Sequence, residues 1–173
     1  MSDKMPGTHS PDVSSQPKEQ YGEKYNEHLL QQYLLYVQMA DKISERRSLA
    51  NTFFLTANTA ILSTLGIVTA ILPTNLVESG FLAFLAAITP VLLCYSWYRL
   101  VRSYQQLNSG KFTVIHEIEA MLPLAPYRAE WIALGEGKNP ARYKPLTDVE
   151  KWVPVTFTIL YVVVALAALF RGM

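Results

Sequence analysis

Three long stretches of this chain contain no charged residue. They cover residues 48–77, 79–98 and 152–170, and apolar side chains dominate each of them. A helix that crosses a bilayer needs roughly 20 consecutive, mostly apolar residues. Three such stretches are difficult to place as buried helices of a soluble core in a chain of 173 residues. The pattern predicts an all-α integral membrane protein with transmembrane helices at 51–72, 81–101 and 152–170.

The first of these stretches continues a polar helix that begins upstream, over residues 21–50. Apolar residues there recur at alternating spacings of four and three, which is typical of a seam between packed helices. A second apolar stripe runs beside the seam, so we expect two neighbours, either a later helix of this chain or other copies of it. The seam comprises Leu29, Tyr33, Tyr36, Ala40 and Ile43, and the second stripe comprises Leu30, Leu34 and Val37.

No glycine or proline occurs between residues 25 and 65, so one continuous helix is expected from about residue 25 to 72. At 1.5 Å per residue it spans roughly 70 Å, over twice the hydrocarbon thickness of a bilayer. Its first half is therefore expected to project from the membrane as part of an oligomer's stalk. The alternative is an amphipathic helix that lies on the membrane surface.

The membrane half of this helix carries small and hydroxylated residues on one face and two asparagines on a neighbouring face. Small and hydroxylated faces allow helices to pack closely in lipid. An asparagine in hydrocarbon is costly unless it is hydrogen-bonded or hydrated. The pattern predicts polar packing between helices, and a pore lining is the alternative. The residues are Asn51, Thr52, Thr56, Asn58, Thr59 and Ser63.

Basic residues predict the orientation in the membrane. Arg46 and Arg47 precede the first span, and Arg99 and Arg102 follow the second, whereas the turn at 73–80 has no Lys or Arg. Because cytoplasmic flanks carry an excess of Lys and Arg, we expect a cytoplasmic N-terminus and a periplasmic turn at 73–80. Three crossings then place the C-terminus outside.

The remaining segments are expected on the cytoplasmic side. Residues 1–20 hold three prolines and four serines, and predict a disordered tail. Residues 102–122 continue the second span as a cytoplasmic helix, with a break or bend expected at 108–110. Residues 123–151 are rich in proline and predict a mostly irregular loop region, with a short helix at 127–134.

The sequence shows little sign of catalytic or cofactor chemistry. The net charge of +1 argues against nucleic acid as a partner, and the single cysteine, Cys94, cannot form an internal disulfide. His116 and Glu119 share a helix face, and His28 approaches them if the cytoplasmic helices pair. These are too few ligands for a metal site. We expect no enzymatic activity, no cofactor and no metal.

Several separate blocks together resemble one family. They are YNEHLLQQYLLYVQMADKISERRSLANTFFLTANTAIL, WYRLVRSYQQLNSGKFTVIHEIEAMLP, APYRAEW and VEKWVP, in this order. They resemble the RipA family of small octameric bacterial membrane proteins. The first block also resembles, more distantly, the SLATT class of two-span membrane effectors. The resemblance implies a homo-octamer in the bacterial inner membrane, whose partners are the lipid bilayer and other copies of itself. We expect a scaffold, with a channel or membrane-perturbing effector as the alternative.

Overall fold

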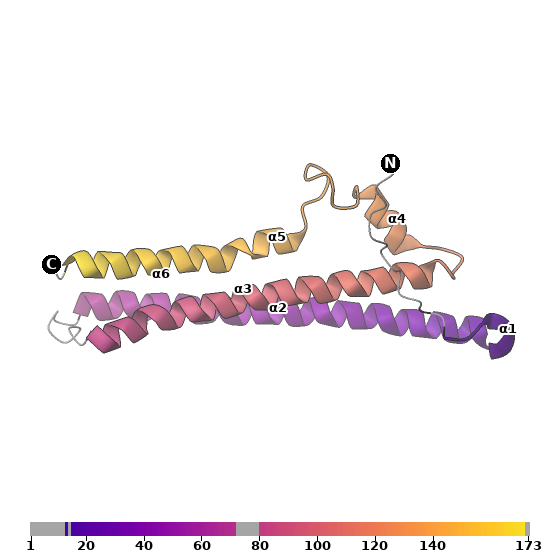
Figure 1. The fold of residues 1–173 in the computed structure, drawn as a ribbon, viewed down its shortest axis with the longest axis horizontal. Coiled ribbons are helices and arrows are strands. Elements are labelled where there is room, and N and C mark those ends of the chain that lie inside the picture. Colours follow the sequence, from indigo (N-terminus) through magenta and orange to yellow (C-terminus); the bar gives the residue numbers. More distant parts are fainter. Residues whose placement is uncertain (1–12, 14, 72–79, 172–173) are drawn as a thin grey trace, which may run out of the picture. The chain divides into compact units, whose positions relative to one another are not determined.

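The computed structural model describes residue 13 and residues 15–71 and 80–171. Side chains are described for these residues except 69, 70, 80–85, 87, 147 and 167–171. Every regular element in this part of the chain is an α-helix, and no strand occurs there (Figure 1). The predicted all-α class is confirmed for the described residues. The predicted turn at 73–80 lies outside them, apart from Gly80.

The longest element is α2 (Tyr25–Ile71), which runs without interruption as the sequence predicts. It is preceded by α1 (Lys18–Tyr21), a single turn of helix. Gly22 separates the two with φ of 92°, a conformation that glycine adopts without steric penalty. The predicted disordered tail is therefore too long, because residues 18–20 belong to α1. Residues 1–12 and 14 of that tail lie outside the described residues.

The second long element is α3 (Gly80–Glu119), which continues through both Pro90 and Gly110. Of the break or bend predicted at 108–110, the break is wrong, because α3 is continuous there. A glycine inside a helix costs roughly 0.5–1 kcal/mol, which is less than the burial of one large apolar side chain contributes. Val101 and Ile115 are both buried on this helix and stabilise it on either side of the glycine. The helix ends before residue 122, because Pro123 disfavours helical geometry in the residue that precedes it.

Three shorter helices follow. They are α4 (Pro126–Ala133), α5 (Leu146–Glu150) and α6 (Trp152–Arg171). The predicted helices at 127–134 and 152–170 are confirmed within one residue at each end. By contrast, α5 lies inside the stretch predicted to be irregular. With only five residues, it is too short to show a helical period in the sequence.

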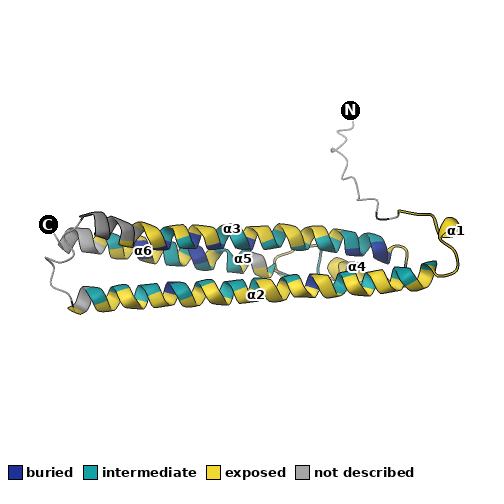
Figure 2. Ribbon diagram, turned by 90° about the horizontal axis from the view of Figure 1, so that it is seen from below, coloured by how far each residue is buried: buried dark blue, intermediate teal, exposed yellow. Residues whose placement is uncertain are grey.

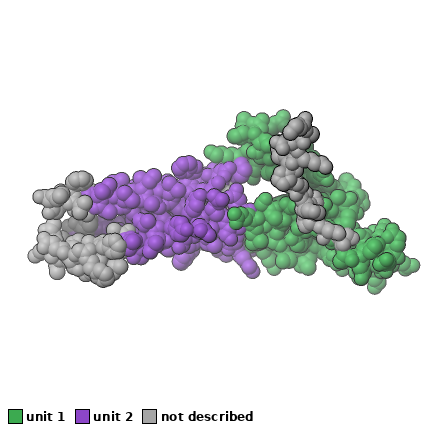
Figure 3. Space-filling view, in the orientation of Figure 1, with its two compact units in different colours: residues 1–44, 106–144 green, residues 45–105, 145–173 purple. Residues whose placement is uncertain are grey.

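The chain divides into two compact units, which are coloured separately in Figure 3. Unit 1 comprises Met1–Ser44 and Gln106–Lys144, and unit 2 comprises Glu45–Gln105 and Pro145–Met173. Buried residues are few in each unit, and most of α2 is half-buried or exposed (Figure 2). Among the described residues, those of unit 1 are Ala40, Ile115, Ile118 and Glu119, and those of unit 2 include Asn58, Cys94, Trp97 and Tyr161.

Two helical stretches of the described residues are long and apolar enough to cross a membrane. They are Tyr25–Val68 and Asp148–Leu166, and only 6% and 11% of their apolar windows are buried. Core helices of soluble proteins are mostly buried, so this exposure distinguishes these helices from them. The predicted span at 81–101 begins among residues whose side chains are not described. It therefore stays a prediction, as does the cytoplasmic location of the helix extensions.

Candidate functional site

Asn58 is the centre of a polar junction that joins three helices of unit 2. Its side chain is fully buried on α2. The Cys94 thiol of α3 donates to Asn58 Oδ1 at 3.2 Å. The Tyr161 hydroxyl of α6 lies 3.1 Å from the same oxygen and 2.9 Å from the Asn58 backbone carbonyl oxygen. The junction therefore fixes α2, α3 and α6 to one another within unit 2.

The amide nitrogen of Asn58 is also satisfied. Asn58 Nδ2 donates to the backbone carbonyl of Phe54 at 2.8 Å, one turn earlier on the same helix. Burying a polar group without a hydrogen bond costs roughly 1–3 kcal/mol by protein mutational data. Here both ends of the amide have partners, so the polar side chain is compatible with an apolar environment.

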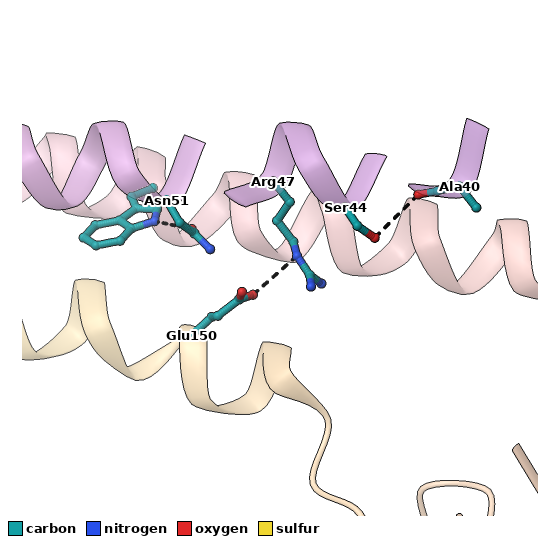
Figure 4. A network of polar contacts seen from close by, with 6 residues as sticks. Ala40, Ser44, Arg47, Asn51 and Glu150 are labelled. Carbon is teal, nitrogen blue, oxygen red and sulfur yellow. Dashed lines mark hydrogen bonds and ion pairs between the residues drawn. The ribbon is translucent and has the colours of Figure 1, made fainter. Parts of the chain in front are cut away.

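Asn51 makes a second polar contact two turns away on α2. Its Oδ1 accepts a hydrogen bond from Trp97 Nε1 of α3 at 2.8 Å (Figure 4). The Trp97 ring stacks on Phe54, with centroids 5.7 Å apart, and lies 6.2 Å from the ring of Phe157 on α6. Tryptophan carries a large apolar body and one donor, so it suits a packed site with a single acceptor.

The hydroxylated residues of α2 do not take part in these contacts with α3 and α6. Thr52, Thr56, Thr59 and Ser63 are all exposed in the protomer. Thr52 and Thr59 donate to the backbone carbonyls of Ser48 and Leu55, at 3.0 and 2.8 Å. The structure thus separates the predicted polar residues into two sets. Asn58 lies between helices of its own chain, whereas the hydroxylated face is open to lipid or to another copy.

An ion pair lies near the start of the unit 2 helices. Arg47 Nε of α2 is 3.7 Å from Glu150 Oε2 of α5 (Figure 4). Both side chains are only 16% exposed. The pair is half-buried, so removing one partner leaves the other charge partly shielded from water and without this counter-charge. Because Glu150 lies on helix α5, which no sequence pattern predicts, this contact cannot be inferred from the sequence.

Glu119 forms the corresponding polar junction of unit 1. Its side chain is 1% exposed. Oε1 accepts hydrogen bonds from the Tyr33 hydroxyl and the Tyr127 backbone N–H, and Oε2 accepts one from the Arg128 N–H, each at 3.0 Å. Tyr127 and Arg128 are in the first turn of α4, where backbone N–H groups have no partner within the helix. The carboxylate therefore caps α4 from another helix.

Several features make Glu119 a suitable cap for α4. Ala125, the residue before α4, has no side chain that can cap the helix, and Pro126 has no N–H. Negative charge is favourable at a helix N-terminus because the helix dipole is positive there. Burial, together with the hydrogen bond to Glu119, raises the pKa of Tyr33 to about 12. Tyr33 thus remains a neutral donor to the carboxylate at ordinary pH.

The seam predicted on α2 packs within the chain. Ala40 is buried, and the other four seam residues are half-buried. Tyr33 reaches Glu119, and the Lys111 ammonium of α3 lies 4.3 Å from the centre of the Tyr36 ring. Of the two neighbours considered for this seam, the structure places the chain's own helix α3 against it. Ser44 extends the same part of α2 and bonds back to the Ala40 carbonyl (Figure 4).

The histidines and acids of the sequence-predicted cluster have other partners. His28 Nδ1 lies 2.8 Å from the Tyr21 hydroxyl, and the ring of His116 lies beside Phe112. Glu119 uses both oxygens to cap α4. Within the described residues, no three His, Cys, Asp or Glu side chains are grouped so as to hold a metal ion.

The cap could not be identified from the sequence, although a signal for part of it is present. Pro126 marks the first position of a helix, which predicts unpaired N–H groups at the next two residues. Nothing in the sequence shows which acid supplies the acceptor, since Glu119 comes before a turn of irregular chain and Tyr33 is 86 residues earlier.

Comparison with known proteins places these features in a family. Neither a search of curated proteins nor a search of solved structures found a match. A family model matches residues 30–170, which run from Leu30 on α2 to Phe170 on α6. The match therefore includes both polar junctions and far more than half of the chain. The chain belongs to the octameric membrane protein family (8xMP).

Proposed function

We propose that this chain is the subunit of a homo-octameric scaffold in the bacterial inner membrane, with a cytoplasmic N-terminus and no enzymatic activity. The observation that carries the proposal is the exposed apolar surface on α2 before its predicted membrane span, over residues 30–39. Leu30, Leu34, Leu35 and Met39 are between 45% and 59% exposed. Lipid does not cover them if this part of the helix projects from the membrane, so other copies are the expected cover.

The rest of the proposal has separate support. Membership of an octameric family supports eight copies, and the two apolar helical stretches support a membrane location. The basic residues beside the spans support the cytoplasmic N-terminus. The resemblance to the RipA family supports the bacterial inner membrane. A scaffold is favoured over an enzyme because both buried polar junctions are occupied by helix-to-helix contacts.

Native mass spectrometry of the purified protein in detergent tests the assembly. We expect a dominant species of eight times the 19.5 kDa subunit mass. Mass photometry in nanodiscs provides a control for dissociation by detergent. A protein that is monomeric in both environments contradicts the proposal.

A channel is the second candidate, and the exposed hydroxylated face of α2 favours it. In a ring, Thr52, Thr56, Thr59 and Ser63 are available to line a water-filled path if this face turns inward. Ion flux into proteoliposomes tests this. A channel lined by this face should conduct, and Thr56→Val with Thr59→Val should reduce its conductance without changing the mass of the assembly. If wild-type octamers show no ion flux, the channel hypothesis is contradicted and the scaffold proposal is retained.

A further inference from the structure

Two exposed flanks of α2 lie on either side of its packed seam in unit 1. The first, here called the acidic flank, consists of Leu30, Leu34 and Asp41. The second, called the basic flank, consists of Leu35, Met39 and Lys42. All six residues are exposed in the protomer, and the leucines of the acidic flank are 48% and 51% exposed. Each flank thus combines uncovered apolar area with one charge.

The helical period places these flanks apart from each other and from the seam. At about 100° per residue, the centres of the flanks are separated by roughly 130° around the helix axis. Gln31 and Gln38 lie on the polar face between them, and the seam against α3 lies on the opposite side. The helix therefore has one side held by its own chain and two further sides that need a neighbour.

The charges of the two flanks are opposite in sign and lie at nearly the same height along the helix axis. Asp41 and Lys42 are adjacent in sequence, so they differ by only about 1.5 Å in height along the helix. The same is true of Leu34 and Leu35. In the described residues neither Asp41 nor Lys42 takes part in an ion pair. In parallel copies related by rotation about a ring axis, residues with the same number lie at the same height. Asp41 of one copy then faces Lys42 of the next.

We propose that the acidic flank of each copy binds the basic flank of the next, in a head-to-tail interface that closes the ring. This inference rests on the proposed homo-oligomer and adds the surface through which it assembles. Head-to-tail interfaces use two different surfaces and close when the rotation between copies permits it. In an eight-membered ring, the two neighbours of a subunit lie about 135° apart as seen from its centre, close to the separation of the flanks.

A second copy fits these flanks better than a lipid surface does. An anionic headgroup layer attracts the basic flank and repels the acidic one, so the helix cannot present both to it. A neighbouring copy of α2 covers both flanks at once and pairs their charges. The polar face between the flanks, with Gln31 and Gln38, then remains open to water.

Charge reversal tests the interface, with native mass spectrometry and a dilution series as the readout. Asp41→Lys places lysine against lysine at every contact, and Lys42→Asp places acid against acid. We expect each single variant to raise the concentration at which the octamer dissociates by roughly tenfold or more. The double variant Asp41→Lys with Lys42→Asp exchanges the two charges and should restore the octamer. Gln31→Lys, on the face between the flanks, is the control and should have no effect.

Cysteine cross-linking tests the geometry in a way that does not depend on stability. Leu34→Cys and Leu35→Cys proteins carrying different tags are co-expressed and treated with a short bis-maleimide. We expect covalent pairs that contain one of each tag, and none when either variant is expressed alone. Links between two Leu34→Cys chains would show a two-fold interface instead, and would overturn the inference.

The outcomes separate this inference from the proposed function. A monomeric wild-type protein contradicts the proposed assembly itself. An octameric wild-type protein that does not respond to either charge reversal, and that gives no mixed cross-link, retains the assembly but overturns the two-flank interface. Loss of the octamer in both single variants without rescue in the double variant also overturns it, because a matched exchange of charges should preserve the contact.

Discussion

Asn58 and Glu119 are the buried polar side chains of the described residues, and each bonds to groups that are far away in the sequence. Asn58 meets Tyr161 across 103 residues, and Glu119 meets Tyr33 across 86. Removing one partner of a buried hydrogen bond leaves the other unsatisfied, and this costs more than the bond itself contributes. Single substitutions at these residues should therefore weaken contacts between whole helices.

Replacing Asn58 by leucine should destabilise the protein by about 1–3 kcal/mol, because the hydroxyl of Tyr161 and the thiol of Cys94 lose their shared acceptor. Thermal unfolding in detergent measures this. Tyr161→Phe should have a smaller effect of about 1 kcal/mol. Thr64→Val is the control, since Thr64 is exposed and bonds only to its own helix at the Ala60 carbonyl. Equal melting temperatures for Asn58→Leu and wild type would contradict the junction.

Replacing Glu119 by glutamine should loosen α4, because the neutral amide loses the charge and one of the two acceptors for the Tyr127 and Arg128 N–H groups. Caps of this kind contribute about 1 kcal/mol. Hydrogen exchange should become faster at these two amides while exchange in the middle of α2 is unchanged. Glu117→Gln, two residues earlier on α3, is the matched control. Unchanged exchange in α4 would show that Glu119 is not its cap.

The raised pKa of Tyr33 predicts a loss of stability at high pH. An unfolded tyrosine loses its proton near pH 10, whereas Tyr33 in the folded protein retains it until about pH 12. Its contribution is therefore fully present below pH 10 and decreases between these values. Absorbance of tyrosinate against pH should show one phenol fewer titrating near pH 12 in Tyr33→Phe. A titration of that variant identical to wild type would contradict this assignment.

At the scale of elements, the sequence predicts long helices well and local details poorly. The bounds of α2 and α6 follow from unbroken periodicity and hydropathy, which depend only on neighbouring residues. The continuity of α3 through Gly110 and the existence of α5 depend on tertiary packing, which no short window of sequence contains. The same limit applies to both junctions. The sequence shows that an asparagine in hydrocarbon needs a hydrogen-bond partner, but it does not show that Asn58 turns away from the hydroxylated face.

Two glycines in different elements should respond to alanine in opposite directions. Gly110 lies inside α3 with open space around it, so Gly110→Ala should stabilise the protein by about 0.5–1 kcal/mol. Gly137 has φ of +69°, and a Cβ there would approach Trp131 Cη2 to 3.2 Å. Gly137→Ala should therefore destabilise by at least about 1 kcal/mol. Chemical unfolding of both variants checks the signs, and changes of the same sign would contradict these local environments.

At the scale of the whole molecule, the main property is the exposure of its apolar helices. Isoleucine, leucine and valine side chains along α2 and α6 remain open to the surroundings of the protomer. In a membrane-protein family this area has two natural covers, lipid for the spans and other copies for the rest. The number of membrane crossings determines which helical segments are covered by lipid and which are left for contact with other copies.

Reporter fusions measure the number of crossings. Green fluorescent protein at the N-terminus should fluoresce, because that end is expected in the cytoplasm. With three spans, alkaline phosphatase fused at the C-terminus should be active and a fluorescent protein there should be dark. A fluorescent C-terminal fusion with inactive phosphatase would instead indicate two crossings, in which case residues 81–101 or 152–170 do not cross.

The distribution of contacts around Asn58 also affects how the protein is made. The ribosome releases α2 first, α3 next and α6 last. The hydrogen bond from the Tyr161 hydroxyl to Asn58 therefore cannot form until synthesis is almost finished. Until α6 is made, the contact that remains to the side-chain oxygen Oδ1 of Asn58 is the one from the Cys94 thiol. A chain that ends before residue 152 thus keeps the contacts of Asn58 to Cys94 and Phe54 but lacks both contacts from Tyr161. The full set of contacts around Asn58 therefore forms only once α6 has been synthesised.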